Sequence, residues 1–202
     1  MKKIGILLLA FATSLVSVQA QAQAQQKTGS FYLGGGAMHT LNDAAPSFAV
    51  SLGGGSASDN ATGYKLYAGY RGEVFGLEAG YYNMGLFQLT TLGGASTEFN
   101  TTAIVGWVTA STPLGASFNM TGKVGLAYTQ AEFVCLQSCA GLANTERTGS
   151  SVPWAVGAGW KLTPAFQVRA EYERFGSVRH SVGLARNTSA YRMISVSGQL
   201  DF

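Results

Sequence analysis

The chain has 202 residues, with 13 basic and 10 acidic side chains and a formal net charge of +3. This near-balance gives no argument for nucleic-acid binding, and no segment after the N-terminus has the roughly 18 consecutive apolar residues of a spanning helix. Glycine is abundant at 27 residues and proline is scarce at 4, and short alternating runs replace helical periodicity. The composition therefore indicates an all-β protein.

The first segment in chain order has the three parts of a secretory signal peptide. Two lysines follow the first Met, residues 4–18 are mostly apolar, and a repeat of alanine and glutamine comes next. The apolar run is shorter than the roughly 20 residues of a spanning helix, and polar residues interrupt it, which favours cleavage over an N-terminal anchor. We expect residues 1–24 to form the signal peptide, with cleavage between Ala20 and Ala24. Residues 25–202 then form one domain.

Eight strand-like runs follow, and the connections between them alternate in length. The expected strands are residues 30–40, 62–71, 74–84, 99–110, 117–130, 151–161, 166–176 and 190–202. The connections alternate long and short from the first to the last, so four hairpin tips lie on one side and both chain ends on the other. Short turns at one end and long loops at the other are typical of an outer-membrane barrel. The predicted fold class is all-β, an eight-stranded antiparallel up-and-down transmembrane β-barrel.

Successive side chains of a strand point to opposite faces, and in these runs one face is apolar while the other carries the charges. In the second run Tyr64 and Leu66 share the apolar face, whereas Lys65 lies on the other. In the third run Tyr81 lies on the apolar face and Glu78 on the polar one. Because lipid tolerates no charges, we expect the apolar faces to meet the membrane and the charged faces to line the barrel.

Aromatic residues at both ends of the apolar faces predict two girdles that face the membrane interfaces. The expected turn-side girdle consists of Phe31, Tyr70, Phe75, Trp107, Phe118, Trp160, Phe166 and Phe202. The expected loop-side girdle consists of Tyr64, Tyr81, Phe99, Tyr128, Trp154 and Tyr172.

The interior of an eight-stranded barrel is just wide enough for side chains to fill, so its desolvated charges need partners. The predicted lumen salt-bridge network consists of Lys65, Glu78, Lys123, Arg169 and Glu171. Of the three cations in this network, Lys65 is the nearest to Glu78 in the sequence, and a hairpin turn near Gly72 would place the two side chains diagonally. Lys123 and Arg169 compete for the same carboxylate.

Four motifs carry a resemblance to a known family: "GYKLYAGYRGEVFGLEAGYYNMG", "TTAIVGWVTASTPLGASFNMTGKVGLAYT", "VRAEYERFGSV" and the terminal "SVSGQLDF". Through their order and spacing the chain resembles the transmembrane domain of the outer membrane protein A family and the broader group of small opacity-type outer-membrane barrels. The resemblance implies that Glu78 and Glu171 are acidic members of an interior salt-bridge network. It also implies that the strand ending at Phe202 is read by the outer-membrane assembly machinery. The sequence departs from the family at Ile104, where an inward Lys is common, and near Asp201, where Arg is common.

Some small outer-membrane barrels modify lipids, and such a reaction would need a nucleophile and a base on one face of a strand. His180 and Ser181 lie close to Glu173 in the sequence, but the adjacent His and Ser point to opposite faces of a regular strand and cannot act together. The two histidines and two cysteines lie too far apart for a zinc site. The sequence therefore predicts no enzyme, no cofactor and no metal.

Two features of the expected loops suggest further chemistry. Cys135 and Cys139 are the only cysteines, and an even count in a secreted chain favours a disulfide over two free thiols. Four arginines in and beside the last long loop form a possible polyanion-contacting surface for lipopolysaccharide phosphates, or an ordinary solvated surface. They are Arg174, Arg179, Arg186 and Arg192.

These observations favour a small integral outer-membrane protein with a structural or surface-interaction role. A narrow porin-like channel for ions or small solutes is the alternative, and a lipid-modifying enzyme is third. The expected partners are outer-membrane lipid, lipopolysaccharide and, through the C-terminal strand, the assembly machinery; no nucleic acid is expected, and the protein is expected to be a monomer. The long loops are expected outside the cell and both mature termini in the periplasm.

Overall fold

The computed structural model describes residues 29–42, 55–91, 96–137, 146–182 and 185–202, and all regular structure in these ranges is β-strand. The strands are β1 (Ser30–Asn42), β2 (Gly55–Ala57), β3 (Asn60–Arg71), β4 (Phe75–Thr91), β5 (Ser96–Leu114), β6 (Phe118–Gln137), β7 (Glu146–Ser151), β8 (Trp154–Thr163), β9 (Phe166–Val182) and β10 (Ala185–Asp201). Within these ranges no helix has the length and apolarity needed to cross a membrane.

Eight of the strands close into an antiparallel barrel, which confirms the predicted fold class. Their order around the ring is β1, β3, β4, β5, β6, β8, β9 and β10, and β10 pairs with β1 to complete it. The short β2 and β7 are not additional strands of the barrel ring. They extend β3 and β8 at the loop side, where β2 pairs with β4 and β7 pairs with β6. Closure leaves no open sheet edge, as a membrane requires.

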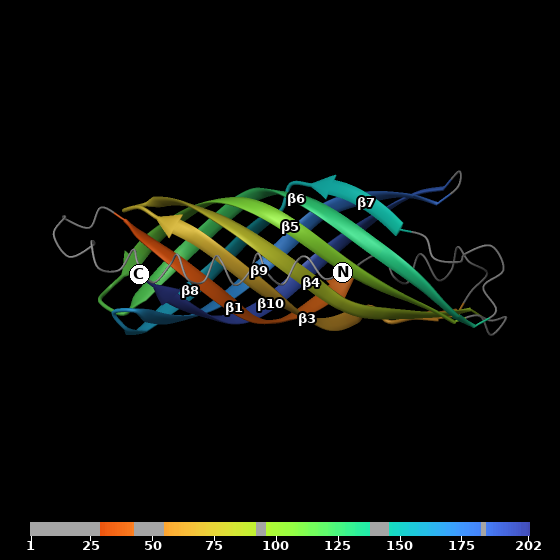
Figure 1. Ribbon diagram of the computed structural model, residues 1–202, viewed down its shortest axis with the longest axis horizontal. Helices are drawn as coiled ribbons and strands as arrows, with labels where there is room; N and C mark the ends of the chain where they lie inside the picture. The colour runs from red at the N-terminus through yellow and green to blue at the C-terminus, as the bar shows by residue number, and fades with distance from the viewer. Residues whose placement is uncertain (1–28, 43–54, 92–95, 138–145, 183–184) are drawn as a thin grey trace, which may run out of the picture.

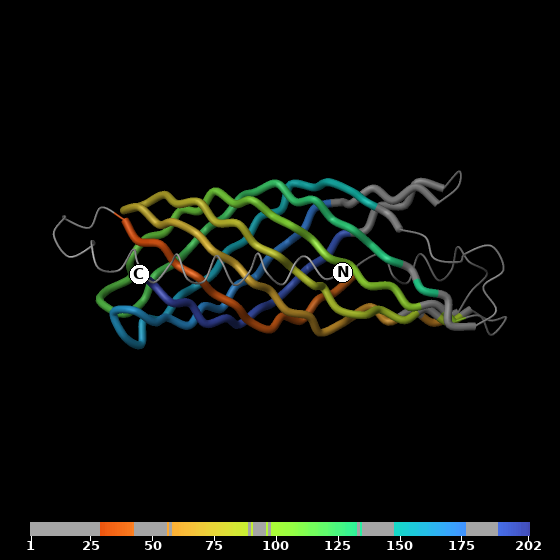
Figure 2. Tube along the Cα trace, in the orientation of Figure 1, coloured from red at the N-terminus to blue at the C-terminus, as the bar shows by residue number. Residues whose placement is uncertain are grey.

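The strands cross the barrel obliquely, as Figures 1 and 2 show. A circuit along the paired residues that leaves β3 at Asn60 returns to β3 at Tyr70, which is ten residues further along the strand. A shift of ten residues in an eight-stranded barrel corresponds to a strand tilt of about 40°. A barrel of this size encloses a lumen that side chains can fill.

The turn side of the barrel carries three short connections, residues 72–74, 115–117 and 164–165, at the left of Figure 1. Gly115 in the second of them has a φ of 83°, a conformation that glycine adopts without strain. Both ends of the described chain lie at this side, since the Phe202 amide donates a hydrogen bond to the Phe31 carbonyl oxygen.

The strands run further toward the loop side than their alternation predicts. β4 continues to Thr91 and β9 to Val182, through segments that we expected to be loops. The register shifts by a bulge between Asn83 and Leu86 in β4, and again in the β9–β10 pair, where β9 has two residues between Phe175 and Val178 and β10 has one between Ser189 and Tyr191. A bulge interrupts the two-residue period, so the sequence pattern stops there although the strand continues.

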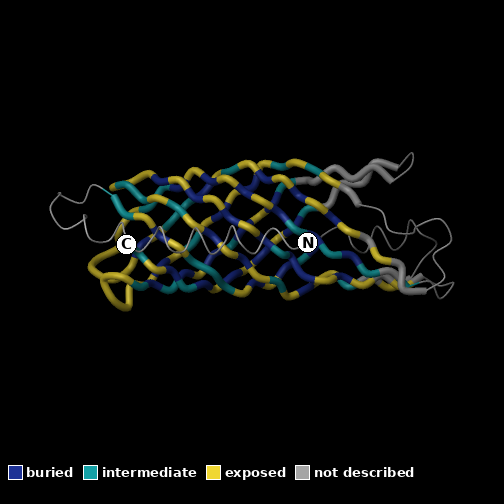
Figure 3. The backbone as a smooth tube through the Cα atoms, in the orientation of Figure 1, coloured by how far each residue is buried: buried dark blue, intermediate teal, exposed yellow. Residues whose placement is uncertain are grey.

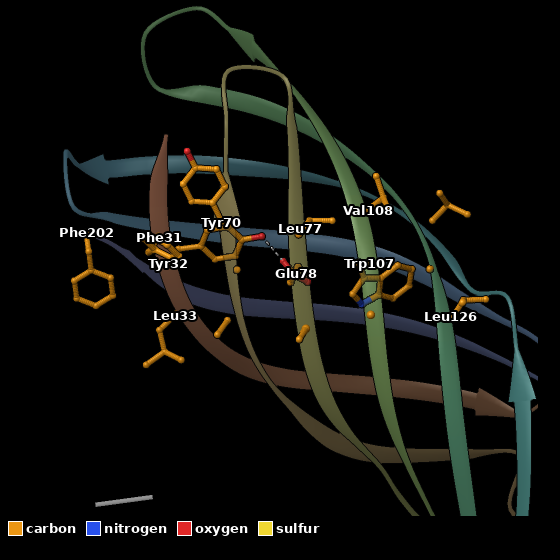
Figure 4. Close-up of a pocket in the computed structure, with 16 residues that line it drawn as sticks. Phe31, Tyr32, Leu33, Tyr70, Leu77, Glu78, Trp107, Val108, Leu126 and Phe202 are labelled. Carbon is orange, nitrogen blue, oxygen red and sulfur yellow. Dashed lines mark hydrogen bonds between the residues drawn. The ribbon is translucent and has the colours of Figure 1, made fainter. Parts of the chain in front are cut away.

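Burial alternates along the strands and confirms the two faces of the barrel wall (Figure 3). On β3, Tyr64 and Leu66 are 48% and 56% exposed, whereas Lys65 and Tyr67 are buried. A row of small outward residues, Ala68, Ala79 and Gly106 on neighbouring strands, lies within an apolar hollow of about 800 Å³. Figure 4 shows the residues that line this hollow, and most of them are apolar, as contact with acyl chains requires.

Two residues of the expected aromatic girdles face the lumen instead. Trp107 is 2% exposed and Phe99 is 8% exposed, so neither meets lipid. The prediction was wrong because β5 carries large apolar residues at adjacent positions, such as Ile104 and Val105. The sequence therefore does not show which of the two alternating sets of side chains on β5 faces lipid. Ile104 is the outward residue, so it does not replace an interior Lys. Trp107 fits inside because it faces Gly125 of β6, where a Cβ atom would come within 2.8 Å of its ring.

Candidate functional site: the filled lumen

Six buried charged side chains cross the middle of the lumen. The cations and carboxylates are equal in number, and the side chains come from β3, β4, β6 and β9. They are Lys65, Lys123, Arg169, Glu78, Glu171 and Glu173, with side-chain exposures of 0 to 6%. The structure therefore brings together all five residues of the predicted network and adds Glu173.

Glu171 lies at the centre of this network. Its carboxylate accepts from the Lys65 ammonium at 2.6 Å, from Lys123 at 2.8 Å and from the Arg169 guanidinium at 2.5 Å. Lys65 also pairs with Glu173. Each of the three cations thus contacts a carboxylate that another cation also contacts. Such pairing offsets the free-energy cost of removing these charges from water.

Glu78 has different partners from the one that we expected. Its two oxygens lie 2.6 Å from the Lys123 ammonium and 3.0 Å from the Arg169 guanidinium. The Tyr32 hydroxyl donates a third hydrogen bond at 3.0 Å, drawn as a dashed line in Figure 4. The expected diagonal contact with Lys65 was wrong because the β3–β4 register places Glu78 opposite Gly69, four residues from Lys65.

An aromatic ring lies among the cations. The Tyr67 ring centroid is 5.7 Å from the Lys65 ammonium, 5.6 Å from the Lys123 ammonium and 4.8 Å from the Arg169 guanidinium carbon. These distances allow cation–π attraction, which gains strength in a desolvated site. Its hydroxyl lies within hydrogen-bond distance of the Ser197 hydroxyl at 3.1 Å. Tyr67 therefore contributes to the network although it carries no charge.

A second, apolar layer fills the lumen and was not foreseen from the sequence. Its large members are Met38, Tyr82, Met84, Phe87, Phe99, Trp107, Phe175, Tyr191 and Met193, all buried. The Phe87 and Phe99 rings stack with centroids 5.0 Å apart, and Tyr82 packs against Phe175 at 5.4 Å. The Trp107 indole N–H donates to the Tyr82 hydroxyl at 3.2 Å.

The β4 bulge explains why Phe87 was not expected inside the lumen. Gly85 within it has a φ of 93°, which glycine adopts readily. Before the bulge the inward residues of β4 have even numbers, as Glu78 does. Beyond the bulge Leu86 is 61% exposed and Phe87 is fully buried, so the odd-numbered residue points inward there. The glycine before two large apolar residues was the only sequence signal for this change.

The turn-side end of the lumen is polar. The Arg71 guanidinium lies 3.0 Å from the Asp201 carboxylate, and Asn119 donates to Gln167 at 3.1 Å. A polar cavity of about 290 Å³ lies at this end, where the exposed Lys161 contributes to the lining. This polar cavity therefore forms the turn-side end of the lumen.

The remaining predicted site residues lie outside the lumen network. Arg174 and Arg192 are exposed and directly opposite each other on β9 and β10. The backbones of Arg179 and Arg186 continue the same two strands, and their side chains lie outside the described part of the structure. Cys135 belongs to β6 and Cys139 lies outside the described residues.

The disulfide between the two cysteines therefore stays a prediction. The side chains of His180 and Ser181 also lie outside the described part of the structure. In the described ranges no group of three or more His, Cys, Asp or Glu side chains is arranged to hold a metal ion.

A closed antiparallel barrel with an apolar outer face and a filled lumen defines a small integral membrane β-barrel protein. The chain belongs to the outer membrane protein beta-barrel domain family, whose family model matches residues 8–197. It is thus a small outer-membrane barrel of the type to which the outer membrane protein A barrel belongs. No curated protein matches the sequence.

Solved structures of several bacterial outer-membrane proteins share the fold. Neisserial surface protein A has a TM-score of 0.60 and 16% identity, with 87% of this chain and 100% of that chain covered. OprG from Pseudomonas aeruginosa has a TM-score of 0.58 and 13% identity, with 88% and 97% covered. Ail, the attachment invasion locus protein of Yersinia pestis, solved with the heparin analogue sucrose octasulfate, has a TM-score of 0.57 and 14% identity, with 87% and 100% covered.

Proposed function

We propose that this protein is an outer-membrane barrel with a sealed lumen, whose role is structural or depends on contacts of its outer surface, and not on conduction or catalysis. The observation that carries the proposal is the charged network of Lys65, Lys123 and Arg169 with Glu78, Glu171 and Glu173. It crosses the lumen from several strands and neutralises itself internally.

A charged network of this kind opposes ion flow for two reasons. An ion that enters the lumen must separate paired charges, and each unpaired buried charge is costly. The apolar layer around Phe87 and Trp107 adds a second barrier, because a narrow hydrophobic constriction excludes water. The two layers are built from different side chains and different chemistry, so loss of one would not open the lumen.

The test is the conductance of purified, refolded protein in a planar bilayer. We expect no stepwise conductance from the wild-type protein. Reproducible steps would contradict the proposal and favour the narrow channel. If steps occur, Arg169→Gln should change their size when the current passes through the lumen and leave it unchanged when the current comes from a contaminant.

The proposed orientation places the three short turns and both mature termini in the periplasm, with the loop side outside the cell. The length asymmetry between the two ends supports it, since outer-membrane barrels have short periplasmic turns. The proposed partners are outer-membrane lipid, lipopolysaccharide and, through β10 and Phe202, the assembly machinery, with a monomer as the working unit.

A further inference from the structure

The hollow of about 800 Å³ in the outer wall lies on the lipid-facing side of the barrel, and most of its lining comes from β1, β3, β4, β5 and β6 (Figure 4). We propose that this hollow binds one acyl chain of a phospholipid in the leaflet at the turn side. The site deepens the proposed contact with membrane lipid. The choice of leaflet, which is the periplasmic one, rests on the proposed orientation.

The hollow is formed by a row of small outward residues between two rows of large ones. Ala68 on β3 pairs with Ala79 on β4, which pairs with Gly106 on β5, and all three are exposed. Leu33 on β1 and Leu126 on β6 continue this row and close it at both ends. The large outward residues of the three middle strands are Tyr70, Leu77 and Val108 toward the turn side and Leu66, Tyr81 and Ile104 toward the loop side.

The floor of the hollow is closed toward the lumen. Gly69 and Gly125 belong to its lining and have no side chains of their own. A Cβ atom at Gly69 would lie 2.5 Å from the Tyr32 ring, and one at Gly125 would lie 2.8 Å from the Trp107 ring. Both rings are buried inside the barrel. The hollow therefore opens toward the membrane, and whatever fills it comes from there.

The depth of the hollow indicates the leaflet. Its lining reaches Phe31 and Phe202 at the turn-side end of the wall, where the Phe202 amide donates to the Phe31 carbonyl oxygen. The exposed Tyr64 and Tyr128 mark the opposite, loop-side interface. A phospholipid whose headgroup lies at the turn-side interface would extend its acyl chains to the depth of the hollow.

An empty hollow at this depth is unfavourable. Its lining is mostly apolar, and apolar cavities stay free of water. Wall atoms that face empty space lose their dispersion contacts. An acyl chain is flexible enough to fill an irregular hollow, and the hollow is continuous with the wall that already faces lipid. The convex wall of a second barrel could insert only single side chains, so the acyl chain is the better occupant.

Two properties of the bound lipid follow from the shape and charge of the hollow. A chain inside it contacts the floor and both large rows, whereas a chain on the convex wall elsewhere contacts one surface, so the bound chain should exchange more slowly. Glu78 is the one charged residue of the lining, and it is 3% exposed and paired inside the lumen with Lys123 and Arg169. The hollow should therefore select the chain and not the headgroup.

The experiment measures phospholipid retention by native mass spectrometry. Wild-type protein, Gly106→Leu and the control Gly122→Leu are refolded into nanodiscs of phosphatidylethanolamine and phosphatidylglycerol in equal amounts, with minor fractions of lipid A and palmitic acid. Collisional activation releases the protein with its most tightly held lipid, which its mass identifies. Gly122 is a matched control because it lies between the outward Met120 and Val124, has nothing within 4 Å of an added Cβ atom and lies outside the lining. Heat-dependent mobility on gels verifies that each variant is folded.

We expect wild-type protein to retain one phospholipid, with both headgroups represented in proportion to their content. Gly106→Leu fills part of the hollow and should lower retention by about tenfold through lost dispersion contacts, whereas Gly122→Leu should leave it unchanged. Equal retention in the two variants would overturn the proposal, as would a strong preference for one headgroup.

Three further outcomes would also overturn it. They are retention of lipid A in preference to phospholipid, retention of palmitic acid in preference to phospholipid, and a dimer that Gly106→Leu abolishes and Gly122→Leu does not. Both leaflets of the nanodisc have the same composition, so the effect of Gly106→Leu does not depend on the orientation of the barrel in cells. Failure of the acyl-chain site and failure of the proposed orientation are therefore distinguished.

Discussion

At the scale of single residues, the pairing inside the lumen follows distance across the barrel and not distance along the chain. Glu78 contacts Lys123, which is 45 residues away, while Lys65 contacts Glu171, which is 106 residues away. Glu171 contacts Arg169 as well and joins the two halves of the network. The energetic coupling between residues should follow these contacts.

A pair of double-mutant cycles tests this pairing. We expect Glu78→Gln and Lys123→Met to be coupled by about 0.5–3 kcal/mol, because the double variant leaves no unpaired charge at their contact. Glu78→Gln and Lys65→Met should be coupled much less, since the structure gives them no direct contact in the described network. Folding titrations in lipid vesicles measure the free energies of unfolding. Equal coupling in the two cycles would contradict the structure.

At the scale of strands, the β4 bulge determines which side chains of the loop-side half enter the lumen. Its register shift buries Phe87 next to Phe99 and leaves Leu86 on the outer face. The bulge depends on Gly85, which has a positive φ and no room for a Cβ atom, since one would lie 2.5 Å from the Thr62 carbonyl oxygen.

Replacing Gly85 by Ala should therefore lower the free energy of unfolding by about 1–3 kcal/mol through backbone strain. Gly106 is the matched control, because it lies on the neighbouring strand with nothing within 4 Å of an added Cβ atom. Gly106→Ala should change stability little. The measurement is a denaturant titration of both variants in vesicles, and equal stability of the two would argue against the bulge geometry.

The outer face of β6 allows a second test at this scale. Val124 is exposed within the apolar band, whereas Gln130 lies on the same face six residues further toward the loop side. Val124→Arg should cost about 2–4 kcal/mol near the bilayer midplane, and Gln130→Arg only about 0–1 kcal/mol near the interface. Refolding yields and unfolding titrations in bilayers compare the two. A similar cost at both positions would contradict the depth assignment.

At the scale of the whole molecule, the barrel has two chemically different ends. The turn side has connections of two or three residues and holds both ends of the described chain, while the loop side carries strands that extend past the apolar band. This asymmetry gives the barrel a direction in the membrane, which Figure 1 shows from left to right.

Epitope insertion tests that direction. Tags at Gly93, between β4 and β5, or between Cys135 and Cys139 should bind antibody on intact cells, because the loop side is proposed to face outward. Tags at Gly72 or Thr163 should bind only after the outer membrane is permeabilised. The opposite labelling pattern would invert the proposed orientation.

Much of the barrel is determined by local features of the sequence. The alternation of Tyr64, Lys65 and Leu66 sets two faces, and the alternating connection lengths set the number and order of the strands. Both features act over a few residues and can be read without knowing any distant contact. The presence of Lys65, Glu78, Lys123, Arg169 and Glu171 in one lumen follows from the same alternation.

The tertiary structure alone decided which of these charges meet and what fills the rest of the lumen. A partner across the barrel depends on the shear of ten residues and on the exact register of each hairpin, and the observed register places Glu78 opposite Gly69, four residues from Lys65, instead of diagonal to Lys65. The inward turn of Phe87 depends on a bulge and that of Trp107 on the space beside Gly125. These are properties of strands packed side by side, and a two-residue period within one strand cannot encode them.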